Sequence, residues 1–527
     1  MSAVARVTLS STLKRSLPRR PLLLPQRRGL ASHTHDQTIR PSDEHPAYEL
    51  MRNTFFKSYH PVSTAISWGE EFWRSVPAYR DVSFKEFLSY RWSTKNTVDS
   101  DHRLHRFLND VMPDEIPEGA GTQSKEEFME DVFRGLKAST IPYLLSRINW
   151  QDPRNDPIFR QFIPLKSLLL PNHPKLSLDS LGEKRDMKVE GLVHRYPDKA
   201  LFIVGADTEC VTKETFKPGR RRWDEIFTYI EANDQIQDIV VSGGDAFYIQ
   251  PEHIRMIGDR LIKIPHIRRF RFASKGLAVA PMRFVDPVDD WANALIEVSQ
   301  KAREAGKEMA LHTHFNHPNE ISWVTEAAAQ RLYKAAVTVR NQTVLLKNVN
   351  DNVETMSSLI KKLANNHVTP YYVYICDMVE NSEHHRTTLQ TMLDLEAQIQ
   401  GSTAGFNIPK FIVDLPGGGG KRVASTWQSY NRETGVSTFE APAVTGAAGA
   451  RGARDKPKVF EYYDPIGHGK DARVSLDEKS PMNLDEKSPA TPDEKRPVTL
   501  NKKNSVNTDG IRSPLFSKRG HSVPSRQ

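Results

Sequence analysis

The sequence predicts an α/β protein: a partial (β/α) barrel of parallel strands, with a helical N-terminal region and disordered tails. Two observations predict this fold. Between residues 199 and 415, short β-rich runs alternate with amphipathic helical stretches, a spacing typical of strand–helix–strand units with right-handed crossovers. Polar residues gather where these runs end, and the carboxyl ends of parallel strands are where barrels bind their ligands.

Residues 1–35 form a basic leader without acidic residues. This segment carries seven of the eight net positive charges of the chain and is rich in Arg, Ser and Leu, which is the composition of a mitochondrial transit peptide; a disordered basic tail is the alternative. The remaining chain is nearly neutral, which argues against a nucleic-acid partner. No apolar run reaches the roughly 20 residues that a membrane span needs. We therefore expect a soluble protein of the mitochondrial matrix.

Residues 48–188 are predicted to be helical. Apolar residues recur there at intervals of three and four, and Ser or Asp stands before the expected helix starts, as in SFKEFLSYRWS. We favour a helical flank of the core over a lid or an arm for homo-oligomer formation.

Residues 189–469 are predicted to form the barrel domain. Helical stretches such as RRRWDEIFTYIEAN and DWANALIEVSQKAREAG separate the expected strands. These strands are ALFIV (200–204), DIVVSGGD (238–245), RFRFA (269–273), EMALHTHF (308–315), AAVTVRNQTVLL (335–346), PYYVYICD (370–377) and KFIVDLP (410–416).

Residues 470–527 are predicted to be a disordered tail. They contain the near repeats DEKSP and DEKRP and almost no large apolar residues, so they cannot bury enough surface to offset the loss of chain entropy. Phosphorylation at Ser-Pro sites is the functional alternative to plain disorder.

The segment FIVDLPGGGGKRVAS is the most informative part of the chain. Asp414 ends a strand, four glycines follow, and Lys421 closes the expected loop. Glycines let the backbone approach a ligand closely, and a lysine after them can hold a phosphate or bond covalently to a cofactor. A nucleotide phosphate loop is disfavoured because Arg422 follows the lysine and Pro416 occupies the first glycine position. A flexible loop without a ligand is the plain alternative.

Two further strand ends carry acids. In VVSGGDAFY, Gly243 and Gly244 turn the chain and free backbone groups for a ligand, and Asp245 can accept from an ammonium group; a tight turn with a helix cap is the alternative. In YVYICDMVENSEHHRT, Asp377 ends a strand.

The stretch HTHFNHPNE contains His312, His314 and His317. Alternating histidines on a strand share a face and could suggest a metal, but no cysteine or acidic residue is spaced to complete the site. We expect these histidines to form positioning hydrogen bonds and predict no metal ligand among them.

Taken together, six motifs resemble the lysine 2,3-aminomutase family of radical S-adenosylmethionine enzymes, which also use pyridoxal phosphate. They occur in order between residues 186 and 421: HRYPDKALFIV, VVSGGDAFY, HTHFNHPNEI, NQTVLLKNVND, CDMVENSEHHRT and VDLPGGGGK. The resemblance implies an isomerase that moves the α-amino group of L-lysine to the β-carbon.

The resemblance also implies roles for individual residues. Lys421 is the expected attachment point of pyridoxal phosphate and the expected catalytic residue. The other expected cofactor-binding residues are Arg195 and Tyr196 for the phosphate and ring, Asn341 and Gln342 as further lining of that site, and Ser242, Gly243, Gly244 and Asp245 for S-adenosylmethionine.

Asp377 and Asp414 match the two carboxylates that hold the distal ammonium of the substrate. Physical chemistry supports this assignment, because a buried cation is costly without compensating charge and two acids at adjacent strand ends would select a diamino acid. A glutamate-like substrate would be repelled. Two loop-capping acids are the alternative.

The sequence departs from the family at one point. In the family, three cysteines follow the strand that corresponds to LFIV, whereas here Val204 is followed directly by GADTECVTKETF. The chain has two cysteines, Cys210 and Cys376, and these cannot supply the three thiolates of a [4Fe-4S] cluster that binds S-adenosylmethionine at its fourth iron. The abrupt boundary between intact motifs favours a segment missing from the sequence over an old loss of activity.

Three hypotheses follow. The first is a lysine 2,3-aminomutase that is inactive as written, the second a non-catalytic pyridoxal-phosphate or amino-acid binding protein on the same barrel. The third is a radical-free pyridoxal-phosphate enzyme, a racemase or decarboxylase, in which SGGD would have no role.

Overall fold

The computed structural model describes residues 71–132, 140–204, 220–242, 245–441 and 458–467. The predicted transit peptide, the predicted tail, Cys210, Gly243 and Gly244 lie outside these residues.

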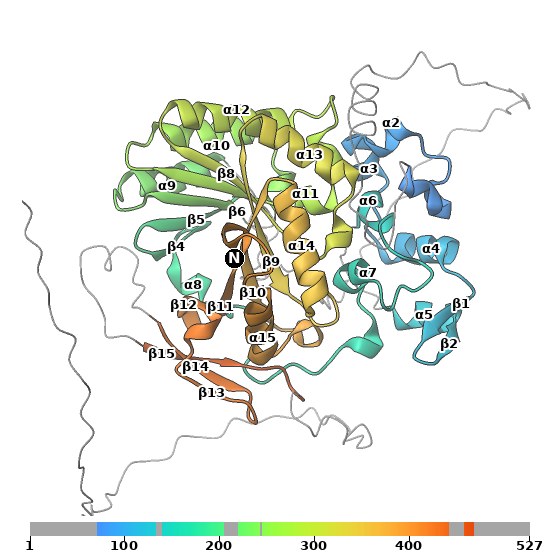
Figure 1. The fold of residues 1–527 in the computed structure, drawn as a ribbon. Coiled ribbons are helices and arrows are strands. Elements are labelled where there is room, and N and C mark those ends of the chain that lie inside the picture. Colours follow the sequence, from blue (N-terminus) through green and yellow to red (C-terminus); the bar gives the residue numbers. More distant parts are fainter. Residues whose placement is uncertain (1–70, 133–139, 205–219, 243–244, 442–457, 468–527) are drawn as a thin grey trace, which may run out of the picture. The chain divides into compact units, whose positions relative to one another are not determined.

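A 10-stranded sheet forms the core and curves into an open, partial barrel, as the sequence predicts (Figure 1). Its order is β12-β11-β10-β9-β8-β7-β6-β5-β4-β3, with β5 to β11 parallel and antiparallel strands at both edges. The strands are β3 (Met187–Val189), β4 (Leu192–Tyr196), β5 (Lys199–Ile203), β6 (Asp238–Ser242), β7 (Arg269–Ala273), β8 (Glu308–Thr313), β9 (Thr338–Leu345), β10 (Val368–Ile375), β11 (Lys410–Leu415) and β12 (Gly420–Val423).

Helices on the outer side connect the parallel strands (Figure 1). They are α9 (Arg220–Glu231), α10 (Pro251–Lys263), α11 (Gly276–Val279), α12 (Trp291–Glu304), α13 (Trp323–Lys334), α14 (Val353–Asn365) and α15 (Leu389–Ile399). Side-chain caps fix several of their starts: the Ser322 hydroxyl accepts from Val324 N before α13, and the Asn352 amide oxygen accepts from Thr355 N before α14. Because helices cover the outer face of the parallel strands, apolar side chains such as Phe270 and Phe272 of β7 are buried, whereas Arg271 of the same strand lines the cavity.

The N-terminal region is a mixture of short helices and one hairpin. The helices are α2 (Phe84–Phe87), α3 (Tyr90–Lys95), α4 (Asp101–Val111), α5 (Lys125–Asp131), α6 (Pro142–Leu145) and α7 (Pro157–Phe162). The hairpin of β1 (Glu115–Glu118) and β2 (Gly121–Ser124) departs from the predicted all-helical region. Both strands are short and mostly polar, so they lack the run of β-branched and aromatic residues that predicts a strand.

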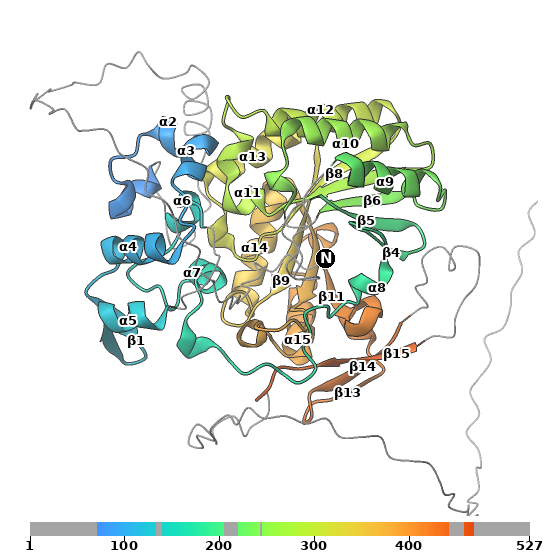
Figure 2. The same cartoon turned by 180° about the vertical axis from the view of Figure 1, so that it is seen from behind.

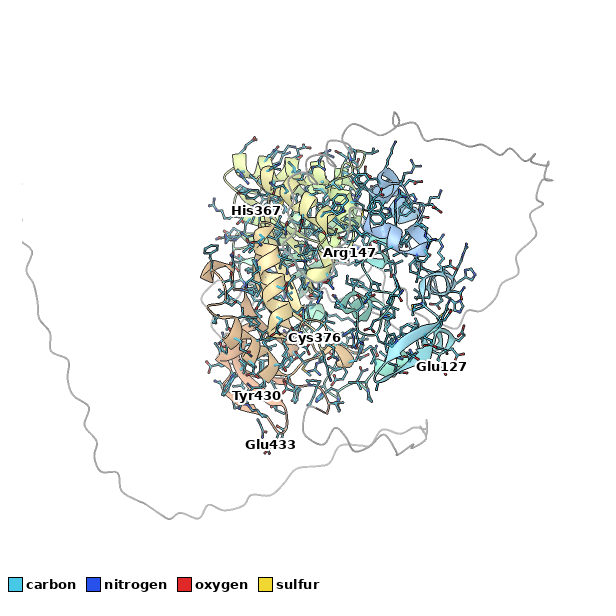
Figure 3. All side chains as sticks on the ribbon, turned by 45° about the vertical axis from the view of Figure 1, so that its right-hand side comes forward. Glu127, Arg147, His367, Cys376, Tyr430 and Glu433 are labelled. Carbon is cyan, nitrogen blue, oxygen red and sulfur yellow. The ribbon has the colours of Figure 1, made fainter. Side chains whose placement is uncertain are left out.

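This region lies beside α11 and α13 (Figure 2). The buried hydroxyl of Tyr143 lies 2.7 Å from Ser322 Oγ and 2.8 Å from Thr325 Oγ1, at the start of α13. Arg147, labelled in Figure 3, donates to the carbonyl oxygen of Asn319 at 2.9 Å. Buried polar groups of the flank are thus satisfied by the barrel, which fixes the two together.

The last described elements form a 3-stranded antiparallel sheet of β13 (Ser429–Asn431), β14 (Val436–Ala441) and β15 (Lys458–Tyr463). The buried Tyr462 of β15 donates a hydrogen bond of 3.0 Å to the carbonyl oxygen of Cys376, immediately beyond β10. Among the helices in the described ranges, none has both the length and the apolar character needed to cross a bilayer.

Candidate functional site

A cavity lies inside the barrel, and its walls enclose about 720 Å³, including the part open to solvent. Aromatic side chains of β10 form one side of it. Charged and polar side chains from β4, β5, β7, β8, β9, β11 and β12 line it as well, together with apolar side chains such as Val193 and Val240. A cavity with aromatic walls and convergent polar groups fits a small organic ligand.

Lys421 and Asp414 meet in this cavity as a cross-strand pair. The sequence predicts a loop closed by Lys421, but the structure places Lys421 on β12, directly opposite Asp414 of β11. The glycines between them form the turn, and Gly417 and Gly418 have φ angles of 69° and 91°, which only glycine adopts readily. The Lys421 ammonium therefore contacts the Asp414 carboxylate, and it lies 5.1 Å from the centre of the Tyr374 ring.

Electrostatics keep this pair charged. Burial, the largest single cause, opposes the charge on Lys421, but the Asp414 carboxylate, Tyr374 and Tyr196 together outweigh it and raise the pKa of the lysine well above its usual value. Burial likewise opposes ionisation of Asp414, yet the Lys421 ammonium lowers the pKa of this carboxyl. In the free protein, Lys421 is thus a protonated amine held next to a nearly inaccessible carboxylate.

Arg195 and Tyr196 of β4 both line the cavity. The Arg195 guanidinium donates to Asp186 Oδ2 at 2.8 Å and to the Leu181 carbonyl oxygen, so it is already engaged by protein groups. The hydroxyl of Tyr196 is buried and lies beside the backbone of Lys421. The Lys199 ammonium lies 3.9 Å from the centre of the Tyr196 ring.

Asn341 and Gln342 are neighbours on β9 and therefore point to opposite faces of the sheet. Gln342 lines the cavity, and its amide nitrogen lies 3.3 Å from His312 Nδ1. Asn341 does not line it; its amide oxygen accepts from Phe315 N at 2.7 Å, and its amide nitrogen donates to Thr343 Oγ1 at 2.8 Å. Asn341 holds the segment after β8 in place.

Of the residues predicted to bind S-adenosylmethionine, the structure describes Ser242 and Asp245, and neither lines the cavity. Ser242 is half-buried at the end of β6, and its carbonyl oxygen accepts from Val204 N at 2.7 Å. Asp245 accepts from Phe247 N and from Lys275 N, each at 2.8 Å. The carboxylate of Asp245 therefore organises the turn that follows β6.

Asp377 follows β10 and is buried, but it does not line the cavity. Its carbonyl oxygen accepts from Val379 N at 2.9 Å. The structure thus brings Lys421, Asp414 and Gln342 together with Arg195 and Tyr196 around one cavity, and it leaves Asp377 outside the wall.

The cavity wall also includes Lys199, Arg271 and His312, which the sequence motifs do not predict to bind a ligand. They occupy three different strands, and only the alternation of side chains along each strand indicates that they face inward. Across the described ranges, no group of three or more His, Cys, Asp and Glu side chains is arranged to hold a metal ion.

Pyridoxal phosphate, implied by the resemblance, fits the residues present. The cavity combines an amine, Lys421, with a buried polar atom that has no hydrogen-bond partner among the described residues, His312 Nε2, and with the hydroxyl of Tyr196. An oxygen-rich aromatic cofactor can satisfy such groups.

The iron-sulfur cluster does not fit. Cys376 is fully buried in an apolar cluster with Val344, Tyr374 and Ile412, and burial raises the pKa of its thiol to about 12. A cluster ligand has to be a thiolate. Cys210 lies outside the described residues, and the chain has no third cysteine.

Comparison with known proteins gives several relatives, although no family model matches the chain. It is 34% identical over 361 residues to L-lysine 2,3-aminomutase of Clostridium subterminale, covering 66% of this chain and 80% of that protein. Identity to L-lysine 2,3-aminomutase of Acetoanaerobium sticklandii is 32% over 356 residues, or 65% of this chain and 80% of the relative. Glutamate 2,3-aminomutase of Clostridioides difficile is 27% identical over 354 residues, with 64% and 76% covered.

Proposed function

Because this chain belongs to the lysine 2,3-aminomutase family, we propose that it binds pyridoxal phosphate at Lys421 and takes a lysine-like diamino acid as its ligand. The observation that carries the proposal is the Lys421–Asp414 pair on the wall of the barrel cavity. The pair combines the amine that a carbonyl cofactor needs with the carboxylate that a second ammonium group needs.

Bound pyridoxal phosphate would supply an aldehyde carbon that joins to amines and a ring that delocalises charge or an unpaired electron from the attached amino acid. The residues of this chain prepare that chemistry. The Lys421 ammonium has to lose a proton to become a neutral nucleophile, and the Asp414 carboxylate, which contacts it, would pass that proton on to the solvent. Tyr374 and Tyr196 flank the amine and limit the access of water.

Asp414 has a second role in this proposal. With pyridoxal phosphate attached at Lys421, Asp414 would no longer face the Lys421 ammonium, and its carboxylate would be able to pair with the distal ammonium of a diamino acid. A substrate with a distal carboxylate would instead place two negative charges together in a buried site. The higher identity to the lysine enzymes than to the glutamate enzyme supports the same choice.

We further propose that the chain as given does not perform radical migration of an amino group, because its two cysteines cannot hold a four-iron cluster. A non-catalytic protein that binds the cofactor and an amino acid is therefore a second candidate function, and the cysteine count is the observation that favours it. The basic leader of residues 1–35 supports a mitochondrial location for either function.

Borohydride reduction tests the proposal. The full chain is incubated with pyridoxal phosphate, reduced with borohydride and mapped by peptide mass spectrometry. We expect a pyridoxyl adduct on Lys421 that disappears in Lys421→Arg. Lys199→Arg is the matched control, because Lys199 lines the same cavity, and this variant should keep the adduct.

An adduct on Lys199, or no adduct above that of an unfolded control, would overturn the assignment of Lys421.

A separate measurement tests the absence of the cluster: anaerobic reconstitution should leave iron and sulfide far below about four of each per chain. Full loading would contradict this part of the proposal. Binding of L-lysine and L-glutamate to the cofactor-loaded chain then tests the ligand class, with L-lysine expected to bind more tightly.

A further inference from the structure

His312 lies on β8 and has one satisfied and one unsatisfied ring nitrogen. It lines the cavity and is 4% exposed. Its Nδ1 lies 3.3 Å from the amide nitrogen of Gln342, which is a donor, so Nδ1 is the acceptor of this pair. The proton of the neutral ring is therefore on Nε2. Nε2 is buried and has no hydrogen-bond partner among the described residues.

The charge around His312 is positive. Burial, followed by the nearby Arg271, Arg340 and Lys199, lowers the pKa of His312 well below its usual value, so the ring stays neutral at physiological pH. Two of these cations, Lys199 and Arg271, line the cavity with it. An N–H donor surrounded by cations can pair only with an electron-rich atom.

The carboxylates on this side do not cancel the positive charge. Asp238 Oδ1 lies 3.1 Å from Arg271 Nη2, and the same carboxylate also serves Arg269. Arg340 has its own partner, since its Nη2 lies near Glu308 Oε1 at 2.5 Å. No ion pair within the described ranges includes Lys199. The Asp238 and Asp198 carboxylates act to raise the pKa of Lys199, but burial, Lys421 and Arg271 lower it more.

We propose that His312, with its ring oriented by Gln342, donates its Nε2–H to an anionic group of the ligand, and that Lys199 and Arg271 supply the positive charge of this anion subsite. A phosphate monoester and a carboxylate share the required chemistry. Naming the phosphate of pyridoxal phosphate as this anion rests on the proposed function; the subsite itself does not.

This inference adds His312 to the residue that the resemblance assigns to the phosphate. Arg195 uses its Nε and Nη2 atoms toward Asp186 and the Leu181 carbonyl oxygen, and it lines the same cavity. His312 offers an unused donor in the same cavity.

Phosphate binding tests the subsite without any enzyme activity. The dissociation constants of inorganic phosphate, pyridoxal phosphate and pyridoxal are measured by calorimetry for the full chain, His312→Phe, His312→Gln and the exposed control His102→Phe. Phe removes the donor, whereas Gln keeps an N–H donor. We expect His312→Phe to weaken phosphate and pyridoxal phosphate about tenfold or more, as for a lost hydrogen bond to a charged group.

The other variants separate the sources of the anion. His312→Gln and His102→Phe should stay within about threefold of the original affinities, and pyridoxal should be insensitive to His312→Phe. If pyridoxal phosphate is unaffected but L-lysine binding weakens, the anion is the amino-acid carboxylate. If none of these ligands responds to His312→Phe, the proposal is overturned.

A spectroscopic readout covers the case in which a variant does not fold. In the unmodified chain with ¹⁵N-labelled histidine, the His312 ring should show the Nε2–H tautomer, and phosphate should shift Nε2 more than Nδ1. An Nδ1–H tautomer, or no shift at saturating phosphate, would overturn the proposal. Failure to form the Lys421 adduct would instead overturn the proposed function, because phosphate binding does not depend on it.

Discussion

The Lys421–Asp414 pair allows a prediction about stability that needs no cofactor. The Asp414 side chain is 3% exposed and that of Lys421 is 21% exposed. Removing one partner of a buried pair leaves an uncompensated charge and costs about 3–5 kcal/mol. Lys421→Met leaves the more deeply buried charge, the Asp414 carboxylate, without its partner, and the loss of unfolding free energy should reach the upper part of this range. Asp414→Asn isolates an amine that water partly reaches, and it should cost about 3 kcal/mol.

The double variant tests whether the two single variants destabilise the protein through the same uncompensated charge pair or through two independent effects. Lys421→Met with Asp414→Asn leaves no charge at either position, so its free energy of unfolding should exceed the additive expectation by at least about 2 kcal/mol. Urea-induced unfolding, followed through the tryptophan fluorescence, gives the three free-energy changes.

A matched cycle at the exposed pair Lys301–Asp259 is the control. Both side chains are about two-fifths exposed, and the coupling there should stay below about 1 kcal/mol. The reasoning is refuted if the two costs at Lys421 and Asp414 add within about 0.5 kcal/mol.

Three other predictions concern packing and pH. Gly258→Ala on α10 should destabilise the protein by about 1–3 kcal/mol in urea unfolding despite its better helix propensity, because the new Cβ would lie 2.4 Å from Val298 Cγ1; a gain in stability would contradict the α10–α12 packing. Burial lowers the pKa of His385 and of His317 to about 3, so the unfolded chain binds more protons between about pH 3 and 6.5. Stability present at pH 7 should therefore fall on acidification, by up to about 2 kcal/mol per histidine at pH 5, and equal thermal midpoints at pH 7 and 5 would refute this. Burial also lowers the pKa of Lys199 to about 8, so sulfate, whose charge is constant here, should bind more weakly at pH 9 than at pH 7, and Lys199→Met should remove this dependence.

Local patterns were sufficient to predict the parallel part of the fold. The run RFRFA coincides with β7, because its apolar residues define a strand without help from neighbours. The run AAVTVRNQTVLL spans residues 335–346, but β9 spans only Thr338–Leu345. Strand ends depend on the last backbone pairing with a neighbouring strand, which a local pattern does not specify.

The candidate site was predictable only in part, for the same reason. The sequence motifs predict Lys421 and Asp414 as site residues, but they do not predict that the two face each other across the antiparallel strands β11 and β12. That contact depends on the register between β11 and β12. Lys199 and His312 belong to strands far apart in sequence, and only the closure of the sheet brings them to one cavity. Neither contact follows from residue spacing.

The small antiparallel sheet after the barrel sets an order of events during synthesis. Tyr462 bonds to the backbone at Cys376, and the buried Asp464 accepts from Leu389 N at 2.8 Å. The residues that surround the cavity leave the ribosome before these two anchors do. A nascent chain that stops before Asp464 therefore has the whole cavity wall but lacks the two contacts that hold the small sheet against the barrel. Premature termination between Lys421 and Asp464 should yield a protein that proteases remove.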